Sequence, residues 1–396
     1  MNATKRTPQL RFPEFTGEWR KKRLGEIGSA AMCKRIFKNQ TKPSGDVPFY
    51  TIGTFGKNPS AFIDKRLFDE YVGKYLFPKK GDILVSASGT IGRLVVYDGE
   101  PAYFQDSNII WLQHDEGLIL NTFLKYVYSR INWIVESSTM PRLYNSNFLA
   151  TRVDMPDTKE QQKIATFLAA VDKRVALLER KVQQLEAYKR GVMQRLFSQQ
   201  LRFTRPDGSH FPAWQERRLG EMLSIPDKIK QNNVDASRIL TVKLHLNGVA
   251  KSAKTETLKI GATNYYVRHA GQFIYGKQNL FNGAIGIIPN NLDGFVSSGD
   301  VPSLDINRDS LIDQFLLYFM SQRNFYRRLE AIASGSGSKR IHESQLFNVR
   351  ISIPSLSEQQ KIAKFLAALD EKITLTRQQL DKTKQFKKGL LQRMFV

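Results

Sequence analysis

Cysteine is almost absent from this chain of 396 residues, because Cys33 is the only one. A single cysteine excludes an internal disulfide and any metal site built from several thiolates, and it fits a reducing compartment. The sequence also lacks a run of the roughly 18 apolar residues needed to cross a bilayer. Its opening, MNATKRTPQLRF, has no apolar stretch of the kind found in secretory signals. These absences predict a soluble, cytoplasmic protein without a membrane segment.

Signatures of catalysis are missing as well. The five histidines show no metal-ligand spacing. No Pro-Pro pair occurs, which excludes the Asn-Pro-Pro-Tyr/Phe motif of an amino-methyltransferase. The nearest approach to a Walker A loop, GQFIYGKQ from Gly271, has Gln278 where Ser or Thr must meet magnesium, and its apolar interior favours a strand. We therefore expect no catalytic residue, no bound metal and no bound cofactor in this chain.

What the chain has in excess is positive charge. It carries 60 Lys and Arg against 37 Asp and Glu, which gives a formal net charge of +23. Such an excess attracts polyanions, nucleic acid foremost, because each neutralised phosphate releases condensed counterions. Charge alone reads no base sequence, and a merely soluble basic protein would show the same excess. With 41% hydrophobic residues the chain can bury real cores, and its length suggests two to four domains.

Two blocks of the sequence occur twice. EQQKIATFLAAVD begins at Glu160 and EQQKIAKFLAALD begins at Glu358, 198 residues later; over residues 160–197, 17 of 38 positions match without a gap. The other block, WRKKRLGEI from Trp19, returns as WQERRLGEM from Trp214 at an offset of 195 residues. Matches of this length predict two copies of one structural unit. The arms between these blocks are nearly equal in length but have diverged far more.

The repeat divides the chain into a first arm domain at 1–155, a helical spacer at 156–200, a second arm domain at 201–353 and a second helical spacer at 354–396. Short apolar runs broken by glycine predict strands in both arms, namely DILVSAS, RLVVY, QFIYG and AIGIIP. Each arm also has a helical stretch, FLKYVYSR from Phe123 or FLLYFMSQ from Phe315. Both arms are therefore expected to share one mixed α/β fold.

Each spacer places its seam residues at alternating steps of four and three, the pattern of a coiled coil. The seams consist of Ile164, Leu168, Val171, Val175, Leu178, Val182, Leu185, Lys189, Val192 and Leu196, and of Ile362, Leu366, Leu369, Ile373, Thr376, Leu380, Thr383, Lys387, Leu390 and Met394. A helix of about 40 residues is about 60 Å long, and an apolar seam of that length needs a partner. The other copy is expected, although a coiled coil between separate chains shows the same pattern. Thr158 or Ser357 is expected to cap the helix start.

The ends of the chain are predicted to meet. In mid-sequence a helix ending QRLFSQQLRF continues straight into the second arm, whereas the first arm has its own QLRF at Gln9 without a helix before it. We predict that the second helix supplies the missing one in space, so that Val396 lies near the N-terminal segment. The predicted fold class is α+β: two mixed α/β domains joined by two long helices that form an antiparallel coiled coil with internal pseudo-twofold symmetry.

Together these blocks resemble the specificity subunit of type I restriction-modification systems. The resemblance rests on the LRFPEFTGEW opening, the GDILVSASGTIGR block, the P-x-x-x-EQQKIA helix start and the repetition of the set. It implies that each arm is a target recognition domain that reads one half of a split DNA sequence. It also implies that the paired helices are a spacer that docks two modification subunits. The residues nominated for this docking are Gln161, Gln162, Phe167, Gln359, Gln360 and Phe365.

The resemblance places the chemistry on other chains. In such systems the modification subunits bind S-adenosylmethionine and methylate adenine in double-stranded DNA, and separate restriction subunits use ATP and Mg to cut. This chain would be the non-catalytic DNA-binding subunit and would bind neither cofactor. The second arm departs from the pattern, because QNLFNGAIG stands where the family has a serine-rich block like SASGTIGR.

Candidate DNA contacts follow from side-chain chemistry. Base edges are read best by Arg, Lys, Asn and Gln, while Ser, Thr and Tyr hold phosphates. The candidates in the first arm are Lys57, Ser86, Ser88, Arg93, Arg142, Tyr144 and Asn145. Those in the second arm are Lys277, Gln278, Asn279, Ser336, Ser338, Lys339, Arg340 and His342. A solvated surface role is the alternative for each.

Two other functions stay open at this point. A self-contained DNA methyltransferase or nuclease would need cofactor loops that the sequence lacks. An architectural DNA-binding protein with two basic lobes would have no need of two different arm surfaces. The divergence of the arms therefore favours sequence-specific recognition.

Overall fold

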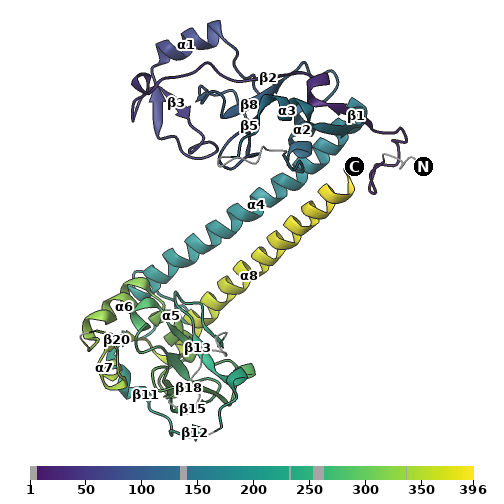
Figure 1. The fold of residues 1–396 in the computed structure, drawn as a ribbon. Helices are drawn as coiled ribbons and strands as arrows, with labels where there is room; N and C mark the ends of the chain where they lie inside the picture. Colours follow the sequence, from purple (N-terminus) through teal and green to yellow (C-terminus); the bar gives the residue numbers. More distant parts are fainter. Residues whose placement is uncertain (1–6, 134–140, 232, 253–262, 336) are drawn as a thin grey trace. The chain divides into compact units, whose positions relative to one another are not determined.

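The computed structural model describes residues 7–133, 141–231, 233–252, 263–335 and 337–396 (Figure 1). Two compact units make up the chain: Met1–Glu179 with Gln378–Val396, and Arg180–Arg377. Two long helices, α4 (Thr158–Phe197) and α8 (Leu356–Arg393), contribute to both units. They lie inside the predicted spacers, whereas the boundary between the units cuts across both helices. None of the helices in the described ranges is both long and apolar enough to cross a membrane.

The first arm contains two small sheets. The larger has the antiparallel order β2-β8-β5-β6, and the smaller has the order β4-β3-β7 with β3 and β7 parallel. A ribbon of two further strands, β1 and β9, leads into α4. The strands are β1 (Arg20–Arg23), β2 (Ser29–Ala31), β3 (Val47–Tyr50), β4 (Ala61–Ile63), β5 (Ile83–Ser86), β6 (Leu94–Val96), β7 (Tyr103–Phe104), β8 (Ile109–Gln113) and β9 (Arg152–Met155). The short helices are α1 (Lys65–Lys74), α2 (Asn121–Tyr128) and α3 (Asn145–Ala150).

The second arm repeats this plan. Its sheet β11-β19-β16-β17 has the antiparallel topology of β2-β8-β5-β6, and a ribbon of β10 and β20 leads into α8. The strands are β10 (Gln215–Arg218), β11 (Leu223–Ser224), β12 (Lys230–Gln231), β13 (Leu240–Val242), β14 (Val249–Lys251), β15 (Tyr265–Arg268), β16 (Phe273–Tyr275), β17 (Ile285–Ile287), β18 (Phe295–Ser298), β19 (Ser303–Ile306) and β20 (Arg350–Ile353). The helices are α5 (Asp313–Met320), α6 (Arg323–Arg328) and α7 (Glu343–Phe347). The strands and helices predicted from the apolar runs are confirmed.

The predicted seams are the buried faces of the long helices. Every seam position in α4 and α8 is buried or half-buried, and Leu168 and Leu366 are fully buried. In the first unit the first turns of α4 and the last turns of α8 pack into one core with Trp19 and Phe123 of the arm. The seam residues therefore pack against the other helix and also against the arm.

Two ion pairs in each unit show that α4 and α8 run antiparallel there, because the residue number of the partner falls along α8 as the residue number rises along α4. In the first unit Asp172 pairs with Lys387. In the second unit Asp370 pairs with Lys189. Asp370 is Asp172 plus 198, and Lys387 is Lys189 plus 198. The two lysines that interrupt the apolar seam thus have an acidic partner on the other helix, and the internal duplication predicted from the sequence is present in the contacts of both units.

The caps predicted for the helix starts are wrong. Thr158 is already the first residue of α4, and the backbone N–H of Glu160 donates to the carboxylate of Asp157 at 2.9 Å. Ser357 lies inside α8, which begins at Leu356. The first helix begins one residue earlier than a Thr158 cap requires, and the second begins two residues earlier than a Ser357 cap requires.

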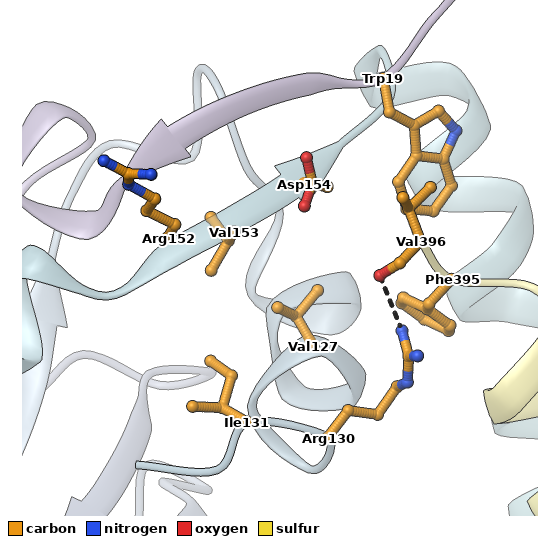
Figure 2. A pocket seen from close by; sticks show the side chains of 9 residues that line it. All are labelled: Trp19, Val127, Arg130, Ile131, Arg152, Val153, Asp154, Phe395 and Val396. Carbon is orange, nitrogen blue, oxygen red and sulfur yellow. Dashed lines mark hydrogen bonds between the residues drawn. The ribbon is translucent and has the colours of Figure 1, made fainter. Parts of the chain in front are cut away.

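The predicted meeting of the chain ends is confirmed in the first unit. The N–H of Leu10 donates to the carbonyl of Arg393 at 2.8 Å. Beyond it, Phe395 packs against Trp19 with ring centroids 6.0 Å apart, and Val396 lies against Trp19 and Arg130 (Figure 2). In the second unit the end of α4 takes the equivalent place, because the N–H of Leu201 donates to the carbonyl of Arg195 at 3.0 Å.

Candidate nucleic-acid interface

The first-arm candidates gather around the turn that follows β5. The hydroxyl of Ser86 is fully buried; it donates to the carbonyl of Thr90 at 2.6 Å and accepts from the N–H of Arg93 at 2.8 Å. Ser86 therefore closes the turn from inside. Gly89 has φ +63°, and the equivalent Gly283 of the second arm has φ +76°, which explains the glycine shared by GTIG and GAIG.

The side chain of Arg93 joins this turn to a second loop. Its Nη1 donates to the carbonyl of Phe55 at 2.8 Å, two residues before the exposed Lys57. The hydroxyl of Ser88, on the other side of the turn, donates to Asn108 at 2.8 Å. The structure thus brings Ser88 and Arg93 of this turn next to the loop that carries Lys57.

Arg142 lies beside the same turn. Its neighbour Leu143 donates its N–H to the carbonyl of Ala87 at 2.8 Å. The Arg142 guanidinium donates to the carbonyl of Ser107 at 2.7 Å and lies 5.8 Å from the ring centre of Tyr144. Tyr144 and Asn145 are exposed at the start of α3. Among the described residues no carboxylate pairs with Arg142, so its charge is available to an anion or a base edge.

Arg340 occupies the equivalent place in the second arm. Its neighbour Ile341 donates its N–H to the carbonyl of Lys277 at 3.0 Å, which repeats the bond between Leu143 and Ala87. The Arg340 guanidinium contacts the carboxylate of Asp300 at 3.2 Å. Asp300 lies in the loop before β19, as Ser107 lies in the loop before β8. Each arm therefore holds one arginine against the same loop.

The other second-arm candidates differ in exposure. Ser338, Lys339 and His342 are exposed, and Lys339 pairs with Glu330 at 2.8 Å. Lys277 is mostly buried and pairs with Glu343 at 3.0 Å. Burial alone would raise the pKa of Glu343, but its own backbone N–H and Lys277 outweigh burial and lower it. Gln278 and Asn279 are half-buried, and Ser336 lies outside the described residues.

The acceptors that orient the two arginines were missed by the sequence analysis. Ser107 and Asp300 belong to no short motif, and Ser107 acts through its backbone carbonyl, which any residue has. The only available signal was their position just before an apolar strand. Strand pairing, which a single sequence does not show, makes that position equivalent in the two arms.

Two of the nominated docking residues, Gln161 and Gln359, are buried and hydrogen-bond to backbone groups of this chain. The side chain of Gln161 is fully buried; it donates to the carbonyls of Leu118 and Pro156 and accepts from the N–H of Leu120. Gln359 does the same in the second unit, with the carbonyls of Ser310 and Pro354 and the N–H of Ile312. These glutamines fasten the arm to its helix and offer no side-chain surface to a partner.

The remaining docking residues lie on the helix surface. Gln162 and Gln360 are exposed. Phe167 is 36% exposed and packs edge-on against Phe12 with centroids 5.9 Å apart. Phe365 packs against Phe203 at 5.7 Å. The aromatic pairs are equivalent, since Phe12 and Phe203 both end an LRF sequence.

The sequence analysis missed four side chains of the long helices that are large, mainly apolar and more exposed than Phe167. Leu177 and Phe386 belong to the first unit and are 52% and 56% exposed. Leu375 and Tyr188 belong to the second unit and are 56% and 55% exposed. Leu375 is Leu177 plus 198, and Phe386 is Tyr188 plus 198. Their recurrence outside the seam was the sequence signal.

A buried carboxylate marks each helix start. Glu160 is fully buried and accepts two hydrogen bonds from Arg11, at 2.7 and 2.6 Å. Glu358 is equally buried and accepts two from Arg202, at 3.1 and 2.7 Å. These bonds raise the pKa of both arginines. The LRF arginines thus fix the segment before each arm to the start of the long helix that follows the same arm.

In the part of the chain that the structure describes, no group of three or more His, Cys, Asp or Glu side chains is placed to hold a metal ion. The absence of a metal and of a cofactor stays a prediction.

Comparison with known proteins agrees with the duplication. The family model of the type I restriction modification DNA specificity domain matches residues 16–187 and again residues 213–385. A type I restriction enzyme specificity subunit from Haemophilus influenzae is 56% identical over 146 residues, which cover 37% of this chain and 38% of that protein. The MjaVIII specificity subunit from Methanocaldococcus jannaschii is 20% identical and is covered to 88%, against 85% of this chain.

Two solved structures share the fold. The type I restriction-modification S subunit from M. genitalium aligns over 98% of this chain and 99% of its own, with a TM-score of 0.60 and 16% identity. A chain from a study of complex assembly and conformational transition in a type I R-M system aligns over 95% of this chain and 97% of its own, with a TM-score of 0.51 and 17% identity.

Proposed function

Because this chain belongs to the type I restriction modification DNA specificity family, we propose that it recognises a bipartite DNA sequence, with each arm reading one half. The observation that carries this proposal is the matched pair of arginines, Arg142 and Arg340. Each directly precedes a residue whose backbone N–H bonds to the turn after the central strand, and each is oriented by the loop before β8 or β19. Two arginines held at equivalent backbone positions, but with different neighbouring side chains, suit the recognition of two different half-sites.

The surroundings of the two arginines differ in chemistry. Arg142 has a carbonyl acceptor and a stacked tyrosine, whereas Arg340 has a carboxylate acceptor. The Nε and Nη2 atoms of Arg340 face Asp300, which leaves Nη1 and the outer hydrogen of Nη2 for a base edge. Two such hydrogens suit the O6 and N7 atoms of guanine. An architectural binder, which reads no sequence, gains nothing from this difference.

The helices are proposed to dock two modification subunits. Leu177 with Phe386, and Leu375 with Tyr188, give each unit one exposed leucine and one exposed aromatic side chain. Large apolar side chains in repeated exposed positions are typical of protein interfaces. Because the set occurs once in each unit, we expect two copies of the partner for each chain.

The chemistry is proposed to belong to the partners. The modification subunits would bind S-adenosylmethionine, and restriction subunits, where present, would use ATP and Mg. The complex would act on double-stranded DNA in the cytoplasm. Purified alone, the chain should transfer no methyl group, hydrolyse no ATP and cut no DNA. Methylation by the isolated chain, free of co-purifying enzyme, would count against this assignment.

Exchange of one arm tests the recognition itself. Residues 24–155 are replaced with the corresponding arm of a relative, and methylated adenines are mapped in cells that also express the modification subunit. We expect one half-site to change and the other to stay, because each arm ends on its own helix and ribbon. A simultaneous change of both half-sites shows joint reading, and binding that random DNA competes away equally well supports the architectural alternative.

A further inference from the structure

One pair of charged contacts between α4 and α8, made by the seam lysines, is the same in both units. Asp172 of α4 pairs with Lys387 of α8 in the first unit, and Asp370 of α8 pairs with Lys189 of α4 in the second. Residues related by the offset of 198 have the same charge. Each helix therefore carries one acidic and one basic member of this set.

In a second pair of contacts, equivalent positions of the two helices carry opposite charges. Glu179 of α4 pairs with Lys384 of α8 at 2.7 Å in the first unit. In the second unit Glu186 of α4 pairs with Arg377 of α8. The offset of 198 relates Glu179 to Arg377 and Glu186 to Lys384, so equivalent positions carry opposite charges. In this set α4 is acidic at both positions and α8 is basic at both.

The reversal matters because α4 and α8 are otherwise alike. They match at 17 of 38 positions and share a seam, so a helix that pairs with its repeat can also pair, antiparallel, with the same helix of a second chain. The first set of charges does not prevent this, since Asp172 of one α4 would meet Lys189 of the other. The second set of charges does prevent it, because Glu179 of one α4 would lie opposite Glu186 of the other.

We propose that the flank of α4 formed by Glu179 and Glu186 is an interaction surface that accepts the basic flank of α8 and rejects a second copy of α4. By the same rule, Arg377 and Lys384 keep α8 from a second α8. Charges beside an apolar seam set the choice of partner in coiled coils in this way. The chain would thereby join its own two helices instead of assembling through like helices of two chains, whatever DNA it reads.

The test is a full-length variant that keeps every ion pair but loses the reversal. Glu186→Lys with Arg377→Glu preserves the pair in the second unit with its sign inverted. Each helix then carries one acidic and one basic residue in this set and becomes complementary to its own copy. The matched control adds Glu179→Lys and Lys384→Glu, which makes α4 wholly basic and α8 wholly acidic in the set and restores the rejection.

All three proteins are unfolded in guanidinium, refolded over a range of concentrations and examined by sedimentation at low salt. Exposed charge pairs are individually weak, but four contacts change from repulsive to attractive in a dimer formed through both helices, so we expect the double variant to dimerise at least about tenfold more tightly than the parent. The fourfold variant should match the parent, and about 1 M salt should remove the difference.

Equal dimerisation of the double variant and the parent would overturn the proposal, as would equal dimerisation of the double and fourfold variants. The control contains both substitutions of the double variant, so a folding defect caused by them alone appears in both proteins. Neither result depends on DNA binding.

Discussion

Among the residues that the structure describes, Arg11 and Arg202 pair with the two most deeply buried charged side chains. Their partners, Glu160 and Glu358, are fully buried at the helix starts. Removing one member of a buried pair leaves an uncompensated charge. We therefore expect Arg11→Met to lower the free energy of unfolding by about 3–5 kcal/mol, and Arg202→Met to do the same in the second unit. Urea unfolding measures both.

The control for this prediction removes the carboxylate as well. Arg11→Met combined with Glu160→Leu leaves no buried charge, and it should recover much of the loss. Single variants as stable as the parent would show that the two clamps contribute nothing to folding.

Asp172 makes the stability of the first unit depend on pH. Burial alone would raise its pKa, but hydrogen bonds from Lys387 and Tyr126 outweigh burial and lower the pKa below its ordinary value of 3.8. A carboxyl whose folded pKa is depressed stabilises the fold above its unfolded pKa, and it loses this contribution as the pH falls through the folded pKa. We expect Asp172→Asn to cost about 1–2 kcal/mol at pH 7, a difference that persists at pH 5 and shrinks as the pH falls below the ordinary value of 3.8.

Urea unfolding of the parent and the Asp172→Asn variant at pH 7, 5 and 3 checks this. The control is Glu179→Gln in the exposed pair with Lys384, where solvent screens the interaction. A difference between Asp172→Asn and the parent that persists unchanged at the lowest pH would refute the role of the ionised carboxylate.

Arg142 and Arg340 are the proposed DNA contacts for which a base contact is easiest to distinguish from a phosphate contact. If they read bases, Arg142→Ala or Arg340→Ala should weaken binding by on the order of 1–3 kcal/mol and relax one position of one half-site. Lys74→Ala, in an exposed pair with Glu70 on α1 and not among the candidate contacts, is the control. Binding to sets of altered targets, with the partner present, measures this. Uniform weakening across all sequences with a shallower salt slope would assign the arginine to a phosphate instead.

At the element scale, the long helices were the part of the fold that the sequence predicted best. A seam such as Leu168 to Leu196 reports burial directly, because apolar residues recur at the helical period. The helix starts were predicted less well. Asp157, rather than Thr158, accepts the N–H of Glu160, and the choice among adjacent polar residues depends on where the preceding strand β9 ends. Gln161 was misjudged for a related reason: its buried partners are backbone groups of the arm.

Helix length is expected to set the distance between the half-sites. Seven residues added to α4 after Arg180 and seven added to α8 after Arg377 keep the heptad pattern in step. Seven residues lengthen a helix by about 10 Å, which corresponds to about three base pairs. We expect methylation at the original target to be lost and any remaining methylation to occur at gaps up to about three base pairs longer.

Methylated-adenine mapping in cells that express the modification subunit measures this gap. Insertion in α4 alone is the control, since it shifts one seam against the other and should abolish methylation altogether. An unchanged gap in the balanced variant would mean that the helices do not measure the distance.

At the scale of the whole molecule, the sequence predicted the duplication and the meeting of the chain ends, because both follow from repeated blocks at a constant offset. The arm surfaces were much less accessible to prediction. Lys277 was nominated as a DNA contact, yet the structure places it mostly buried against Glu343. Such pairings bring together residues far apart in sequence, and a single diverged arm carries no pattern that reveals them.

The equivalence of the two connections allows the chain to be reopened elsewhere. In the second unit Phe197 reaches Leu201 through Ser198, Gln199 and Gln200, and Leu201 bonds to Arg195; in the first unit Leu10 bonds to Arg393 without a covalent connection. A permutant that joins Phe395 to Leu10 through a copied Ser-Gln-Gln and begins at Gln199 should therefore fold and direct methylation to the parent's target. Opening the chain at Lys181, in the middle of α4, is the control that should fail, because it interrupts the helix and its seam.

Circular dichroism establishes folding, and methylation mapping with the modification subunit establishes function. A Gln199 permutant that folds but no longer directs methylation would show that the break between Phe395 and Leu10 is required, and the two connections would then not be interchangeable.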